Sequence, residues 1–153
     1  MRRSVVTKAL LLGMFVTSLV HAATNVGAPE GFIEVRPEQV PWRPHPAMQG
    51  AEFAVLVGAL DRPGPLVVRV KLPPRARFMP HTHPEPRTYT VISGEWKLGF
   101  GHDYDEKALL SYGPGSMYRL PAQVAHFQST GPEPTIVQIE SIGPTKTEFV
   151  KAR

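Results

Sequence analysis

The stretch PHTHPEPRTYTVISG, residues 80–94, carries most of the fold prediction, because two histidines one residue apart precede a β-rich run that ends at a glycine. In an extended strand successive side chains point to opposite faces, so His81 and His83 project from one face, about 6.6 Å apart along the strand. Imidazoles placed in this way can chelate a metal ion. A third histidine, His126, lies on a second predicted strand. The fold must bring His126 to the first two for a site to form.

The first 22 residues have the pattern of a secretory signal peptide. Basic residues stand at positions 2, 3 and 8, residues 9–19 are apolar, and the small-residue pattern VHA at 20–22 is typical of a cleavage site. An apolar run of about 11 residues is short for a membrane span, which needs about 20. The alternative is a buried N-terminal helix. We expect a periplasmic or secreted protein with no stable membrane association after cleavage.

Charge and cysteine content exclude several function classes. The leader carries three of the 17 Lys and Arg and none of the 13 Asp and Glu, so 14 basic and 13 acidic residues remain, a net charge of +1. No Lys/Arg-rich block with interleaved aromatic residues is present, so no nucleic-acid partner is expected. Cysteine is absent, which excludes disulfides, thiolate ligands and thiol nucleophiles. Any metal must be held by His, carboxylate or amide side chains.

After the leader, a proline-rich arm at residues 23–50 precedes a β-rich domain at residues 51–153. The arm has one candidate strand, residues 32–35, and its His45, between two prolines, is expected to be a solvated loop residue. The domain is long enough for one core. Short β-rich segments recur between Gly/Pro turns, and residues 103–110 could form a helical turn, which together predict an all-β double-sheet jelly roll. The predicted strands are 52–60, 66–72, 78–83, 89–93, 95–100, 116–120, 124–129, 135–142 and 146–150.

These residues resemble the two motifs of the cupin family. In the first motif a His-x-His pair is followed by a glutamate and then a glycine, and His81, His83 and Gly94 match it. In the second, Gly115 and His126 match at the family's spacing, with Pro121 between them. The resemblance spans about residues 66–142. It implies a cupin double-stranded β-helix, or jelly-roll barrel, with His126 opposite the histidine pair inside the barrel. Cupins of this kind commonly pair, so a homodimer is expected.

The chain also departs from the cupin pattern. Arg75 and Gln123 stand where the motifs have glycine, and Thr130 stands where the second has asparagine. More important for function, Arg87 occupies the position of the glutamate that is the family's usual fourth ligand.

Two residues could replace the missing ligand or support the three histidines. Gln128 shares a strand face with His126, and its amide oxygen could bind metal or hold a water. Glu85 is close to His83 in sequence but lies between two prolines, and a glutamate in such a turn is more often solvated.

Arg87 has two interpretations. A guanidinium beside a divalent cation is repelled, by about 4 kcal/mol for unit charges 4 Å apart at an effective dielectric near 20. Arg87 could instead turn aside to pair with Glu85 or Glu95, or it could clamp a carboxylate or phosphate of a ligand by bidentate hydrogen bonds. Tyr89 and Tyr118 are expected to line the same pocket as hydrogen-bond donors, although aromatic strand residues are more often core.

The function prediction is a three-histidine site, His81, His83 and His126, for one divalent transition metal (Zn, Ni, Fe, Mn or Cu). Such a site would bind or act on a small oxygenated, acidic molecule, with dioxygenase, decarboxylase or isomerase chemistry if it is an enzyme. The alternative is a metal-free or non-catalytic cupin that binds a sugar or another small molecule. No catalytic residue is assigned.

Overall fold

The computed structural model describes residues 27–151 of the chain. The predicted signal peptide lies outside the described residues. Residues from Ile33 onward form one compact unit. Within the described part of the chain, no helix is long and apolar enough to cross a membrane.

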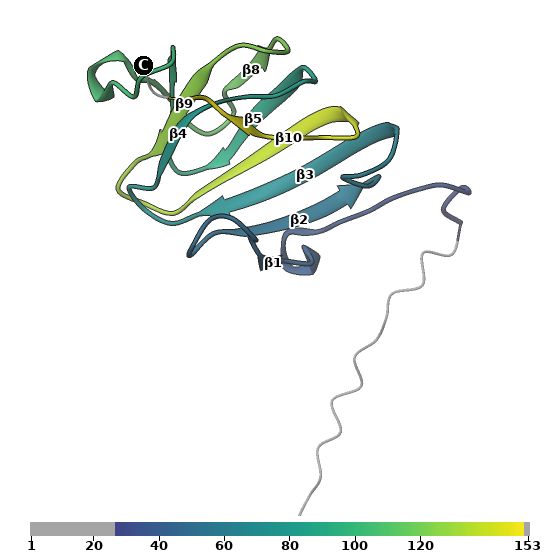
Figure 1. Ribbon diagram of the computed structural model, residues 1–153. Coiled ribbons are helices and arrows are strands. Elements are labelled where there is room, and N and C mark those ends of the chain that lie inside the picture. Colours follow the sequence, from purple (N-terminus) through teal and green to yellow (C-terminus); the bar gives the residue numbers. More distant parts are fainter. Residues whose placement is uncertain (1–26, 152–153) are drawn as a thin grey trace, which may run out of the picture. The chain divides into compact units, whose positions relative to one another are not determined.

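The described residues form eleven short β-strands and two single-turn 3-10 helices (Figure 1). The bounds are β1 Arg43–Pro44, β2 Glu52–Val57, β3 Gly64–Leu72, β4 Arg77–Thr82, β5 Arg87–Ser93, β6 Trp96–Phe100, β7 Leu110–Tyr112, β8 Met117–Leu120, β9 His126–Thr130, β10 Thr135–Gly143 and β11 Glu148–Phe149, with the helices η1 Pro37–Gln39 and η2 Glu106–Ala108. Helix η2 lies in the segment 103–110, where a helical turn was predicted.

The strands make two antiparallel sheets. One has the order β1-β2-β3-β10-β5-β8 and the other the order β11-β4-β9-β6-β7. In Figure 1 the long strands β2, β3 and β10 run side by side, and β4 and β9 belong to the second layer. Sequence neighbours such as β4 and β5 lie in different sheets, as in a double-stranded β-helix. The all-β jelly-roll prediction is confirmed.

The core forms where the inner faces of the two sheets meet. Along β3 the buried residues alternate, with Leu66, Val68, Val70 and Leu72 inside, as period-two geometry requires. Side chains from the other sheet, such as Trp96 on β6, complete the same cluster. Apolar burial of this kind is the main favourable term in folding.

The N-terminal part of the fold differs from the prediction. The strand expected over residues 32–35 does not form, so that prediction is wrong. The edge strand is instead β1, where Arg43 and Pro44 pair with Phe53 and Glu52 of β2. A proline can join a sheet only where its missing N–H is not needed, which an edge strand allows.

Arg75 and Gln123, which stand where the cupin motifs have glycine, adopt the backbone conformation typical of glycine. Arg75 has φ 53° and Gln123 has φ 61°, and both values lie in the left-handed region that glycine favours. Each backbone N–H is used, from Arg75 to the Gly131 carbonyl and from Gln123 to the His83 carbonyl, both at 2.8 Å. These hydrogen bonds help to hold the left-handed conformation at positions where a side chain is costly.

Gly94 ends the stretch of residues 80–94, and its replacement should be strongly destabilising. Its φ is +77°, and an added Cβ would overlap Thr135 and the Pro134 carbonyl. We expect Gly94→Ala to lower the free energy of unfolding by about 2 kcal/mol or more, from left-handed strain and overpacking together. Urea denaturation measures the change. Gly113→Ala is the control, since an added Cβ there meets nothing within 4 Å, and equal losses in both variants would contradict this explanation.

Candidate metal centre

The pairing of β4 with β9 places two of the three histidines opposite each other. His81 pairs with His126, and Phe78 pairs with Gln128. Directly opposed residues of antiparallel strands share a face, so all four side chains point to the same side of the sheet. Phe78 and His81 are three residues apart and would face opposite ways on a regular strand. The register shift between them, a β-bulge, makes their common orientation possible.

The three histidines form one buried cluster. The ring centroids of His81 and His126 lie 4.2 Å apart, those of His81 and His83 4.9 Å, and those of His83 and His126 5.1 Å. One potential ligand atom from each ring lies within 4.8 Å of the others, an arrangement that could hold a metal ion. The fold therefore brings His126 to the histidine pair, as the sequence predicted.

Backbone carbonyls fix the tautomer of each ring. The Nδ1 atoms of His81, His83 and His126 lie 2.7, 2.9 and 2.9 Å from the carbonyls of Met79, Lys146 and Val124. A carbonyl can only accept, so each Nδ1 carries the hydrogen and each Nε2 keeps its lone pair.

The Nε2 atoms are available for an ion. Nε2 of His126 is buried and has no hydrogen-bond partner. Nε2 of His83 accepts from the Tyr89 hydroxyl at 3.3 Å. An orphaned buried acceptor is costly unless something binds it, and a Nδ1–H bonded to a carbonyl is the usual arrangement behind a metal-bound imidazole. The residues present fit a divalent transition metal.

All three imidazoles have lowered pKa values. Burial, the largest cause, and the positive charge of Arg87 lower the pKa of His83 to about 3. Burial and the neighbouring His81 lower the pKa of His126 to about 4, and burial also lowers the pKa of His81. The rings are therefore neutral at neutral pH, which is the form that binds metal.

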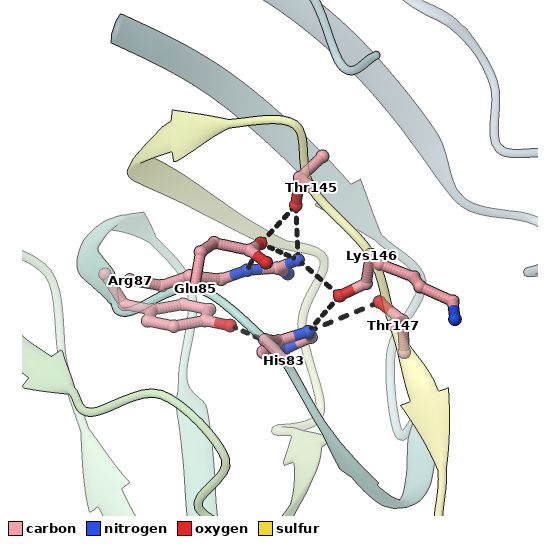
Figure 2. A network of polar contacts seen from close by, with 7 residues as sticks. His83, Glu85, Arg87, Thr145, Lys146 and Thr147 are labelled. Atoms are coloured by element: carbon pink, nitrogen blue, oxygen red, sulfur yellow. Dashed lines mark hydrogen bonds and ion pairs between the residues drawn. The ribbon is translucent and has the colours of Figure 1, made fainter. Parts of the chain in front are cut away.

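Arg87 pairs with Glu85, one of the two partners expected for it. Its Nε and Nη2 atoms donate to Glu85 Oε1 at 2.8 and 2.6 Å, and both residues are buried (Figure 2). Thr145 also donates to Glu85 Oε1. The Glu85 carboxylate is thus bound to Arg87 and Thr145, while its Oε2 is buried without a partner. Among the described residues, the cluster with metal-binding geometry contains the three histidines and not Glu85.

The other predicted site residues lie around the histidines. Gln128 is buried on β9, where it faces Phe78 and Leu98 on the neighbouring strands, and its Nε2 has no partner. Tyr89 is fully buried, and burial raises its pKa, so its hydroxyl stays protonated and can donate. Tyr118 stacks on Tyr89 with ring centroids 4.9 Å apart, and its hydroxyl accepts from Trp96 Nε1 at 2.9 Å. Tyr118 therefore holds the Tyr89 ring in place by stacking on it.

A cavity of about 430 Å³ opens beside the cluster. His81 and His83 line it, whereas His126 is fully buried next to them. Arg87, Tyr89 and Gln128 also reach it. Most of the remaining lining is apolar: Met48, Phe53, Leu60, Leu66, Val68, Val70, Leu72, Phe78, Met79, Trp96, Val137, Ile139 and Phe149.

His45 also lines this cavity, although we expected it to be a solvated loop residue. Its ring contacts Phe53 edge-on, and its Nδ1 accepts from the Ala47 N–H at 3.2 Å. The proline-rich sequence around it gave no signal of this, because the position depends on the pairing of β1 with β2. Nε2 therefore carries the ring hydrogen and is a donor.

The sequence matches the family model of the ChrR cupin-like domain over residues 30–145. The chain belongs to this family. Comparison with curated proteins returned no match. The cupin resemblance noted in the motifs is confirmed.

Solved structures share the fold at low identity. The polyketide cyclase RemF from Streptomyces resistomycificus matches with a TM-score of 0.63 and 18% identity, covering 80% of this chain and 87% of that one. KdgF from Halomonas sp. matches with a TM-score of 0.54 and 18% identity, covering 72% and 93%. The DMSP lyase DddQ from Ruegeria pomeroyi matches with a TM-score of 0.53 and 17% identity, covering 68% and 56%. At these identities the likeness shows the fold alone.

The lowered histidine pKa values predict acid sensitivity of the metal-free protein. Histidines of the unfolded chain take up protons below a pH of about 6.5, whereas buried His83 and His126, with pKa values of about 3 and about 4, do so only at lower pH. The free energy of unfolding of chelator-treated protein should therefore fall as the pH drops from about 6.5 to about 4, by up to about 1.4 kcal/mol per pH unit for each histidine. Urea titrations across this range measure the slope. His126→Gln should flatten it, because glutamine takes up no proton; a slope equal to that of the wild type would contradict the assignment.

Proposed function

We propose that this protein binds one divalent transition metal ion through Nε2 of His81, His83 and His126. The observation that carries the proposal is the cluster of three buried, neutral imidazoles, each with Nδ1 bound to a carbonyl and with the lone pair on Nε2. Zn, Ni, Fe, Mn and Cu all accept such ligands. When bound, the ion supplies a Lewis acid that polarises an oxygen of a ligand, or a centre for oxygen chemistry.

The ligand is proposed to be a small molecule with an acidic oxygen and an apolar body. Three neutral imidazoles leave the charge of the ion uncompensated in a buried site, because Glu85 is occupied by Arg87. An anionic oxygen such as a carboxylate or enolate is then the favoured further ligand. The apolar lining favours an aliphatic or aromatic body, which a polar sugar would not match.

Tyr89 and Gln128 would orient that oxygen. The Tyr89 hydroxyl donates to Nε2 of His83 when no ion is there, and an ion on Nε2 would release it for the ligand. Nε2 of Gln128 is a second buried donor without a partner. Both residues line the cavity, so the two donors are available to one bound molecule.

Two activities are consistent with such a site. Metal-dependent dioxygenase, decarboxylase or isomerase chemistry would use the polarised oxygen of the ligand, and the cyclase and lyase among the structural neighbours have the same fold. The alternative is a binding module without turnover. It is favoured by one observation: the described lining of the cavity includes no Asp or Glu that could serve as a general base.

Metal content tests the first part of the proposal. Purified protein should contain about one transition metal ion per chain by elemental analysis, and His81→Ala should lose nearly all of it because two imidazoles bind weakly. His102→Ala is the matched control, since His102 is exposed and lies outside the histidine cluster. Metal at background level in wild type after growth and reloading with each candidate ion would reject the site.

A ligand panel separates the enzyme from the binding module. Metal-loaded protein is incubated with small aromatic and aliphatic keto, hydroxy and carboxylic acids, and both product formation and heat of binding are recorded. We expect saturable binding of apolar acids that chelator treatment abolishes, because the acidic oxygen needs the ion. Products would favour the enzyme, and binding without products the module. Binding that survives chelator treatment unchanged would contradict a ligand on the metal.

A further inference from the structure

His83 differs from the other two histidines in what orients it. His81 and His126 each donate Nδ1–H to a carbonyl two residues earlier, so their own strands fix them. His83 donates to the carbonyl of Lys146, which is 63 residues away in the chain. The orientation of the His83 ring therefore depends on a distant segment.

That segment lies along the outer edge of the second sheet. Strand β11 pairs with β4, with Glu148 opposite Thr82 and Phe149 opposite His81. The Val150 N–H donates to the Pro80 carbonyl at 2.9 Å. A two-residue edge strand contributes few hydrogen bonds of its own. The Thr145 N–H also donates to the Leu60 carbonyl at 2.9 Å, and side-chain contacts act on the Lys146 carbonyl itself.

Arg87 supplies these contacts. Its Nη2 donates to the Lys146 carbonyl at 3.0 Å and to Thr145 Oγ1 at 2.5 Å (Figure 2). Glu85 Oε1 accepts from Arg87 and from Thr145 and so closes the network. Figure 2 shows the guanidinium between the Glu85 carboxylate and the segment at Thr145 and Lys146, with the His83 ring on the same carbonyl.

We propose that Arg87, Glu85 and Thr145 act as a positioning unit that holds the Lys146 carbonyl in place and thereby orients His83 for metal binding. The inference rests on the proposed metal site. It assigns a role to the arginine that stands where cupins have a ligand carboxylate. Arg87 does not coordinate the ion; it supports the site by holding the Lys146 carbonyl, which in turn orients His83.

A guanidinium is suited to this role. It is planar and has several donors in a fixed fork, so it can bind a carboxylate, a hydroxyl and a carbonyl together. A lysine ammonium at the same place has no fixed fork and would not hold the three acceptors in one geometry. The pair with Glu85 also makes the buried unit neutral, which lets it sit beside an ion without a net positive charge.

Two variants disrupt the unit without leaving a buried charge unpaired. Thr145→Val removes one hydroxyl at nearly constant volume. The double variant Glu85→Leu, Arg87→Met removes both charges together, since loss of one partner alone would leave the other buried and uncompensated. Thr90→Val is the matched control: it makes the same chemical change on β5, where Thr90 alternates with the buried Tyr89 and Val91 and so faces away from the Arg87 and Glu85 contacts.

The first measurement needs no metal. Long-range ¹H–¹⁵N spectra of the chelator-treated protein report which nitrogen of each histidine carries the hydrogen. Wild type and Thr90→Val should show Nδ1–H at all three rings. In Thr145→Val and in the double variant, His83 alone should shift toward a mixture of tautomers, with His81 and His126 unchanged. A uniform Nδ1–H signal at His83 in both network variants would overturn the proposal.

The second measurement is the affinity for Co²⁺ by competition with a chelator. Contacts behind a metal ligand typically change affinity by 10 to 100-fold, so we expect a loss of about tenfold in the network variants and little change in Thr90→Val. Equal losses in Thr145→Val and Thr90→Val would overturn the role of the network. If wild type binds no Co²⁺, the proposed metal site fails, and the tautomer spectra still decide whether the unit orients His83.

Discussion

The structure of the site depends on the pairing of β4 with β9 and on the bulge within it. With a regular β4, Phe78 and His81 would face opposite sides of the sheet, and only one of them could reach the interior. The register shift between these two residues allows both to face inward. Pro80 lies in the shifted part and has no backbone N–H. A bulge at this position therefore costs no hydrogen bond from residue 80, whereas in a regular ladder the missing N–H would leave a gap. The apolar wall at Phe78 and the histidine cluster can therefore share one strand.

The sequence was informative where local periodicity sets the geometry. The spacing of His81 and His83 predicts a common face, and two motifs in the right order predict that His126 joins them. For Arg87 the sequence left two roles open, a pair with Glu85 or Glu95 and a clamp on a carboxylate or phosphate of a ligand. No local pattern chooses between Glu85 and Glu95, because both lie within reach on the sequence and the choice depends on where Thr145 and Lys146 return.

Other features could not be predicted because they depend on long-range packing. His45 reaches the cavity because β1 joins the sheet edge, and a loop between prolines carries no periodic signal of such a contact. The left-handed backbones at Arg75 and Gln123 are likewise set by the fold, since hydrogen bonds to Gly131 and His83 hold them. At Arg75 and at Gln123 the sequence shows only that a motif glycine is missing. The surrounding structure keeps the left-handed backbone conformation that the glycine would adopt.

The replacement of a ligand carboxylate by Arg87 changes the electrostatics of the whole centre. A glutamate ligand would reduce the charge of a bound ion and occupy one of its positions. Here the arginine and Glu85 neutralise each other, and the ion would be held by neutral rings alone. Such an ion keeps a stronger attraction for an anionic oxygen from outside the protein. The same substitution that removes a protein ligand would thus increase the demand for an external one, and it ties His83, one of the three proposed ligands, to the segment at Lys146.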